Sequence, residues 1–222
     1  MQKFDTPAAV LAVLDITAGH IRLIAADRAD TTVEILPADA TRSRDIKTAE
    51  QTEVTYQDGV LRVRTPQARN RLLGPSGSIE VTVQLPAGSR VQATAAAAGL
   101  RGVGRLGDLT FDGAHGQVKL DEADTVHLTG LDADITIGRL TGPGEISTQR
   151  GDLTITEAVR GTLTLSTQKG DINIGAAAGV SATLDAGTTY GRIDNTLKNS
   201  DTTPALALRA TTTHGTITAR SL

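Results

Sequence analysis

Residues 147–155 read STQRGDLTI, and residues 166–174 read STQKGDINI. Both stretches contain Ser-Thr-Gln, one basic residue, Gly-Asp, and then alternating aliphatic and polar residues. The first contains Arg-Gly-Asp, a tripeptide known as a cell-adhesion signal, but the second has Lys169 where the first has Arg150. Because the frame recurs without the tripeptide, we interpret Arg-Gly-Asp as part of a structural repeat rather than as a receptor signal.

The frame extends over the C-terminal part of the chain. A small residue recurs at intervals of 17 to 24 residues, at Ala98, Gly116, Ala133, Gly151, Gly170, Gly191 and Gly215. An aliphatic residue stands two positions after each of them, at Leu100, Val118, Ile135, Leu153, Ile172, Ile193 and Ile217. Aliphatic and polar residues alternate on both sides of the small residue, which is the period of β-strands. Each copy therefore predicts two short strands joined at a small-residue corner.

One copy cannot bury its own aliphatic side chains, whereas stacked copies form a continuous internal ladder. We therefore predict an all-β fold, a right-handed parallel β-solenoid (β-helix-like) of about seven short rungs. We expect the rungs to stack in sequence order, with residues 210–222 as the last rung. That rung would leave an open edge, which either pairs with a second chain or is twisted away.

Residues 1–88 contain strand patterns without so regular a period. Residues 52–66 predict a hairpin, with Asp58-Gly59 suited to a type I′ turn. Residues 38–51 and 67–77 read as solvated loops, or as one short helix in the first case. We predict that residues 1–88 form irregular strands and a hairpin covering the solenoid, and that residues 89–222 form its regular repeats. We expect one continuous domain, with a separate small β-domain as the alternative.

The composition narrows the range of functions. The chain is 2% aromatic, contains 23 Gly and no Cys, and carries a net charge of −3. The absence of Cys excludes disulfides and thiol chemistry, and the charge argues against a nucleic-acid binder. The first residues lack a signal-peptide pattern, and no segment reaches the length of a membrane span. We therefore expect a cytoplasmic protein without membrane insertion, with surface exposure by a non-standard route as the alternative.

The Gly-Asp units at residues 151–152 and 170–171, after the N-terminal stretch LDITAGHIRLIAAD at residues 14–27, carry a resemblance. This pattern resembles the bacterial β-strand-repeat "putative adhesin" family of unknown function, and the likeness covers most of the chain. The resemblance implies a right-handed β-solenoid. Its motif is a structural repeat and implies no chemistry.

Three acidic residues follow the corners at the same position, namely Asp134, Asp152 and Asp171. On stacked rungs their carboxylates would lie roughly 5 Å apart, close enough to repel one another or to share a cation. The structural alternative is that the neighbouring Arg150 and Lys169 neutralise them across rungs. These five residues are the surface binding candidates; the sequence suggests no catalytic, cofactor or metal residues.

Two further patterns have structural explanations. GVGRLG at residues 102–107 matches a dinucleotide fingerprint, but strand alternation follows it instead of the helix that such a site requires. A basic group near residues 67–77 reads as a solvated hairpin face, with docking of an acidic partner or polyanion as the alternative; it comprises Arg62, Arg64, Arg69 and Arg71.

No nucleophile with a paired base, no metal motif and no phosphate loop stands out. We therefore predict a non-catalytic β-solenoid scaffold or interaction module without a cofactor. Its partner would be a protein, or a second copy bound through an exposed solenoid edge, and a glycan is a possible further ligand. The alternatives are a surface adhesin or carbohydrate-binding protein, and a carbohydrate-active β-helix enzyme.

Overall fold

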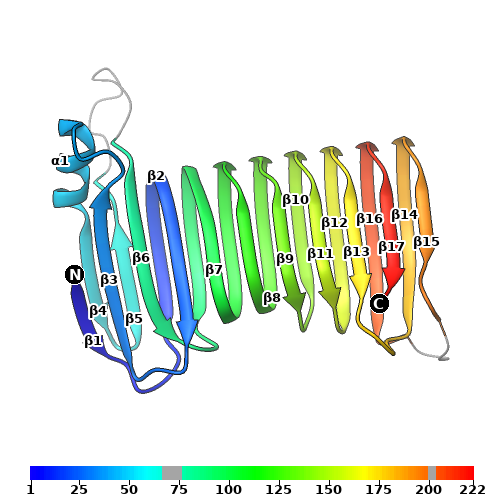
Figure 1. Ribbon diagram of the computed structural model, residues 1–222, viewed down its shortest axis with the longest axis horizontal. Helices are drawn as coiled ribbons and strands as arrows, with labels where there is room; N and C mark the ends of the chain where they lie inside the picture. The colour runs from blue at the N-terminus through cyan, green and yellow to red at the C-terminus, as the bar shows by residue number, and fades with distance from the viewer. Residues whose placement is uncertain (67–76, 200–203) are drawn as a thin grey trace.

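The computed structural model describes residues 1–66, 77–199 and 204–222. The chain forms a flattened coil whose rungs lie side by side along the long axis of the molecule, each with one strand on each of two facing layers (Figure 1). This arrangement confirms the predicted all-β solenoid. The right-handed coil and the number of rungs stay predictions.

The regular part of the coil begins with a long strand that bends through more than one rung. Its elements are β7 (Arg90–His115), β8 (Val118–Asp132), β9 (Ile135–Leu140), β10 (Gly144–Arg150), β11 (Leu153–Ala158), β12 (Gly161–Lys169), β13 (Ile172–Ala176), β14 (Ala182–Tyr190), β15 (Ile193–Thr196), β16 (Leu206–His214) and β17 (Ile217–Ser221). Neighbouring rungs pair in parallel. The alanine-rich run at residues 91–100, predicted as strand, lies in β7.

The predicted aliphatic ladder is confirmed through the middle of the stack, whereas Ile193 of the outermost rung is 41% exposed. Val118 pairs with Ile135, Ile135 with Leu153, and Leu153 with Ile172. All four side chains are at most 2% exposed. Burying one such side chain is worth about 1.5–3 kcal/mol, so repetition of the ladder supplies much of the stability of the stack.

The predicted order of the last rungs is wrong. The final rung of the sequence, residues 206–221, lies between the rung of residues 161–176 and that of residues 182–196. Its strand β16 pairs with β12 on one side and β14 on the other, and β17 lies likewise between β13 and β15. Figure 1 shows the C-terminus inside the stack, with β14 and β15 at its end. Residues 182–196, which we call the outer rung, therefore carry the open edge that was predicted for residues 210–222.

A similar exchange occurs at the other end. Strand β2 (Leu11–Ala26) pairs in parallel with β7 on one side, and with β5 (Val60–Arg64) and β6 (Ile79–Pro86) on the other. The first full rung of the sequence thus lies inside the stack. Residues 1–88 and 89–222 consequently contribute strands to one sheet.

Antiparallel strands and a helix close this N-terminal end. Strand β3 (Asp30–Pro37) pairs with β6, β1 (Gln2–Asp5) with β3, and β4 (Glu53–Gln57) with β5. The Asp58-Gly59 hairpin turn is confirmed, since both residues have positive φ, as a type I′ turn requires. The predicted short helix is α1 (Ser43–Gln51), whose Asp45 carboxylate accepts the Ser78 N–H at 3.0 Å. Most of the predicted loop at residues 67–77 lies outside the described residues.

The small residues at the corners are explained by close contact between rungs. Gly170 has φ +154°, and a Cβ on it would lie 2.0 Å from the carbonyl oxygen of Gly151 in the adjacent rung. Gly151 has φ +126° and would meet the Ala133 carbonyl in the same way. Glycine therefore lets the rungs approach to hydrogen-bonding distance at the corner.

Candidate functional site

The three predicted acidic residues line up on the outer face, and their carboxylates bond the backbone of the neighbouring rung. Asp134 Oδ1 accepts the Asp152 N–H at 3.0 Å, and Asp152 Oδ1 accepts the Asp171 N–H at 2.8 Å. Asp171 Oδ1 accepts the Thr216 N–H at 2.7 Å, which extends this Asp column into the final rung. One oxygen of each carboxylate thus serves the solenoid itself. Binding of a cation or partner at this column stays a prediction.

The two basic candidates lie next to each other, since Arg150 and Lys169 are in register on β10 and β12. The ion pair of Arg150 is with Asp132, at 3.6 Å from Nη1 to Oδ2, rather than with a member of the Asp column. Both partners are largely exposed, so the pair adds at most about 1 kcal/mol. Both charged residues of the Arg-Gly-Asp tripeptide are therefore engaged at the corner, Arg150 in an ion pair and Asp152 in backbone hydrogen bonds.

A second polar column was missed at the sequence level. The hydroxyl of a threonine three residues before the corner donates to the corner carbonyl of the adjacent rung, from Thr167 to Gly151 (3.2 Å), Thr212 to Gly170 (3.1 Å) and Thr188 to Gly215 (3.1 Å). The signal was present in the sequence, because Thr stands at this position in each of these rungs. The hydroxyls reach the corner carbonyls because the threonine side chains point inward at a bend. The alternation of aliphatic and polar residues does not specify that direction.

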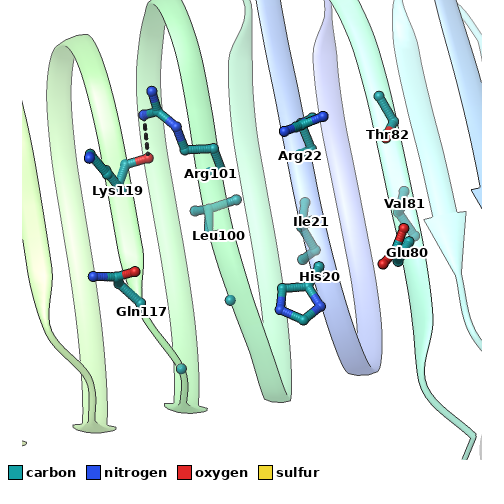
Figure 2. Close-up of a pocket in the computed structure, with 12 residues that line it drawn as sticks. His20, Ile21, Arg22, Glu80, Val81, Thr82, Leu100, Arg101, Gln117 and Lys119 are labelled. Atoms are coloured by element: carbon teal, nitrogen blue, oxygen red, sulfur yellow. Dashed lines mark hydrogen bonds between the residues drawn. The ribbon is translucent and has the colours of Figure 1, made fainter. Parts of the chain in front are cut away.

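A groove of about 480 Å³ lies on the outer face of β2, β6, β7 and the start of β8. Figure 2 shows its polar side chains, which are His20, Arg22, Glu80, Thr82, Arg101, Gln117 and Lys119. The floor is low because Gly99 and Gly116 have no side chains. We call this feature the basic groove, since three of its lining residues are cations and Glu80 is its one carboxylate.

The central cation of the basic groove is held in place by several acceptors. Arg101 Nη2 lies 2.6 Å from Asp121 Oδ1, and its Nη1 donates to the carbonyls of Gly102 (2.9 Å) and Lys119 (3.3 Å). The bond to the Lys119 carbonyl is the dashed line in Figure 2. Asp121 also accepts the Gly104 N–H at 3.2 Å, so the ion pair is anchored to the backbone. The Arg101 guanidinium is thereby preorganised.

A second groove, of about 700 Å³, lies at the opposite bends of the rungs. It contains Arg105, Asp124, Thr141 and Arg160. Asp124 accepts the Thr141 hydroxyl at 2.8 Å, and Arg160 Nε donates to the Thr141 carbonyl at 3.1 Å. These bonds connect three successive bends.

The structure also shows where the dinucleotide fingerprint and part of the basic group near residues 67–77 lie. Residues 102–107 continue strand β7, so the dinucleotide fingerprint opens no helix. Of the basic group near residues 67–77, Arg64 pairs with Asp15 at 3.5 Å, and Arg62 is exposed on β5. Arg69 and Arg71 lie outside the described residues. Over the described part of the chain, no three His, Asp or Glu side chains converge as metal ligands, and no helix could cross a membrane.

Known proteins share this fold. Residues 12–220 match the model of a family described as Toastrack DUF4097. A solved "putative adhesin" from Bacteroides fragilis shares 13% identity over 98% of this chain and 95% of its own, with a TM-score of 0.58. A "putative adhesin" from Parabacteroides distasonis shares 15% identity over 98% and 95%, with a TM-score of 0.50. No curated protein matches this chain.

Proposed function

The chain belongs to the Toastrack family, whose function is unknown, and on this premise we propose that it is a non-catalytic interaction module. Its binding element would be the outer rung, and its partner a second copy of the chain. The observation that carries the proposal is the unpaired edge of that rung. Among the described residues, β14 pairs only with β16 and β15 only with β17.

The outer rung also leaves part of the core uncovered. Leu184 and Ala186 are half-buried, whereas Leu208 and Ala210, their partners in the final rung, are at most 1% exposed. The ring of Tyr190 stacks on His214 but remains 66% exposed. The Ala182 N–H at the start of β14 is already bonded to the Lys198 carbonyl at 3.1 Å. A further rung would bury these apolar groups and satisfy the remaining free backbone groups of the edge.

The sequence of the edge does little to prevent such pairing. Natural edge strands are commonly protected by Pro, by Lys, by inward-pointing charges or by bulges. Strand β14 reads ATLDAGTTY, with neither Pro nor Lys, and its one charge, Asp185, lies on the exposed outer face. Two outer rungs related by a two-fold axis would meet through the same residues of each chain, as in most homodimers.

The test is sedimentation equilibrium over a wide range of protein concentration. Ala186→Lys places an inward charge in the outer rung and should abolish the dimer that the wild-type chain forms. Thr164→Lys adds the same charge on the exposed face of β12, which lies between covered rungs, and should dimerise as the wild type does. Circular dichroism and thermal unfolding establish that both variants are folded.

A wild-type chain that stays monomeric at the highest concentration would overturn self-association as the function of the edge. Equal dimerisation of the wild type and Ala186→Lys would place the interface elsewhere. Loss of the dimer in both lysine variants would point to a general charge effect.

A surface adhesin is the second candidate, because solved structures with this fold carry that name. The two candidates differ in location. An adhesin must reach the cell surface, whereas we propose that the self-associating module is cytoplasmic. Protease treatment of intact host cells, followed by detection of the chain in cytosol, membrane and medium, separates them. Degradation of the chain on intact cells would favour the adhesin.

A carbohydrate-active enzyme is the third candidate. Glycoside hydrolysis generally uses two carboxyl groups that flank the scissile bond. The described residues that line the basic groove include one carboxylate, Glu80, and those that line the second groove include only Asp124. This lining supports binding rather than hydrolysis at either groove.

A further inference from the structure

Three cations lie directly beside one another on the outer face of adjacent rungs. Arg22 of β2 is in register with Arg101 of β7, and Arg101 is in register with Lys119 of β8. Thr82 and Thr136 continue the same row on either side. Because parallel strands lie about 4.8 Å apart, this cation row presents one positive charge per rung along the axis of the solenoid.

Such a row is unfavourable for the folded chain, because like charges directly opposite each other on neighbouring strands repel. Asp121 compensates Arg101 in the middle of the row. Neither Arg22 nor Lys119 has a carboxylate within ion-pair distance among the described residues. Glu80 lies opposite His20, two residues before Thr82, which is the partner of Arg22. The two outer cations of the row are therefore available to an external anion.

The shape of the basic groove adds a second constraint. At Gly99 a Cβ would lie 3.6 Å from His20 Cδ2 and 3.4 Å from the Gln117 carbonyl, both ordinary contacts, so nothing in the backbone requires glycine there. The missing side chain instead keeps the floor open beside the cation row. Polar groups of His20, Gln117 and Thr82 surround the opening.

The lining also restricts the chemistry of the ligand. None of the described residues that line the basic groove is Phe, Tyr or Trp. A single-stranded nucleic acid would lack its usual stacking platform there, and the chain as a whole carries a net charge of −3. An uncharged sugar would likewise find no aromatic face. Recognition must rest on charge, supplemented by hydrogen bonds to hydroxyl groups.

We propose that the basic groove binds an acidic polysaccharide with one carboxylate on each sugar ring. Arg22 and Lys119 lie two rungs apart, on the order of 10 Å. The carboxylates of the first and third rings of an extended trimer then meet Arg22 and Lys119, and the ring hydroxyls meet Gln117, Thr82 and His20. This site is remote from the outer rung, so it does not depend on the edge association proposed above.

The experiment is isothermal titration calorimetry of the full chain with a trimer of galacturonic acid at low ionic strength. The trimer should bind, and its affinity should fall as salt is raised, because the pairs are exposed. Arg22→Gln with Lys119→Gln should lower the affinity at least tenfold. The matched control, Lys47→Gln with Arg209→Gln, removes two exposed cations from α1 and β16 and should bind as the wild type does.

Two further ligands and one further variant test the class of ligand. A neutral galactose trimer should not bind, and tripolyphosphate should bind more weakly than the acidic trimer. Gly99→Leu fills the floor and should weaken binding with the cation row intact, at unchanged thermal stability. Absence of binding by the acidic trimer, equal binding by the neutral trimer, stronger binding of tripolyphosphate, or equal affinities in both double variants would each overturn the proposal. Self-association should be unchanged in all of these variants.

Discussion

The corner glycines show how single residues set the distance between rungs. At Gly151 and Gly170 the positive φ and the nearby carbonyl oxygen both exclude a side chain. The Asp column acts at the same place, because each carboxylate accepts a backbone N–H of the neighbouring rung. The sequence predicted which aspartates align, but it did not reveal this bond, since the bond depends on backbone angles at the corner that residue spacing does not encode.

Gly170→Ala should therefore lower the free energy of unfolding by about 3 kcal/mol, because the new Cβ would lie 2.0 Å from the Gly151 carbonyl oxygen. The control is Gly187→Ala in β14, where a Cβ meets nothing within 4 Å, and it should change stability by less than about 0.5 kcal/mol. Urea unfolding of both variants measures the difference. Similar losses in the two variants would contradict the steric explanation of the corners.

At the scale of elements, both ends of the solenoid are built by an exchange of rung order. The pairing register between neighbouring rungs was predictable, because a shift by one residue would turn the aliphatic side chains to the outer face. The order of rungs was not predictable, because each rung presents much the same aliphatic ladder to its neighbour. Residues 206–221 therefore fit between two other rungs as well as they would fit at the end, and β2 does the same at the N-terminal side.

The exchange predicts losses of stability of different size for two leucines in equivalent positions. Leu208→Ala in the final rung should cost about 3 kcal/mol, because the side chain is 1% exposed between two rungs. Leu184→Ala in the outer rung should cost about 1 kcal/mol, because that side chain is half-buried. Urea unfolding ranks the two variants. A larger loss at Leu184 would favour stacking in sequence order.

The N-terminal antiparallel strands should add an acid-sensitive contribution to stability. Hydrogen bonds from Arg28 and then Lys3 lower the pKa of Asp30 from 3.8 to about 2. Because the folded-state pKa lies below the unfolded value, this stabilisation is fully present above about pH 4 and is lost as pH falls through about 2. Asp30→Asn should thus be less stable than the wild type at neutral pH, and the gap should close between about pH 4 and pH 2. A gap in urea midpoint that is constant over this range would contradict the assignment.

For the whole molecule, the two ends have different characters. Antiparallel strands and α1 close the N-terminal end, whereas at the other end no described strand pairs with the outer side of the outer rung (Figure 1). The basic groove also belongs to this scale, because Arg22 becomes the neighbour of Arg101 only through the placement of β2 against β7. No local motif could predict it, since its cations are separated by most of the N-terminal region. Polar residues recur at every second position on the outer faces whether or not they bind a ligand, so their spacing does not identify a binding site.

The central claim is that residues 182–196 form an open, binding-competent end while residues 206–221 lie inside. Residue-resolved amide hydrogen exchange of the wild-type chain at low and high protein concentration tests it most directly. At low concentration, amides of β16 and β17 should exchange slowly and those at the free edge of β14 and β15 quickly. At high concentration the edge amides should become protected while the rest are unchanged. Fast exchange in β16 and β17, or an outer rung whose exchange does not respond to concentration, would contradict the account.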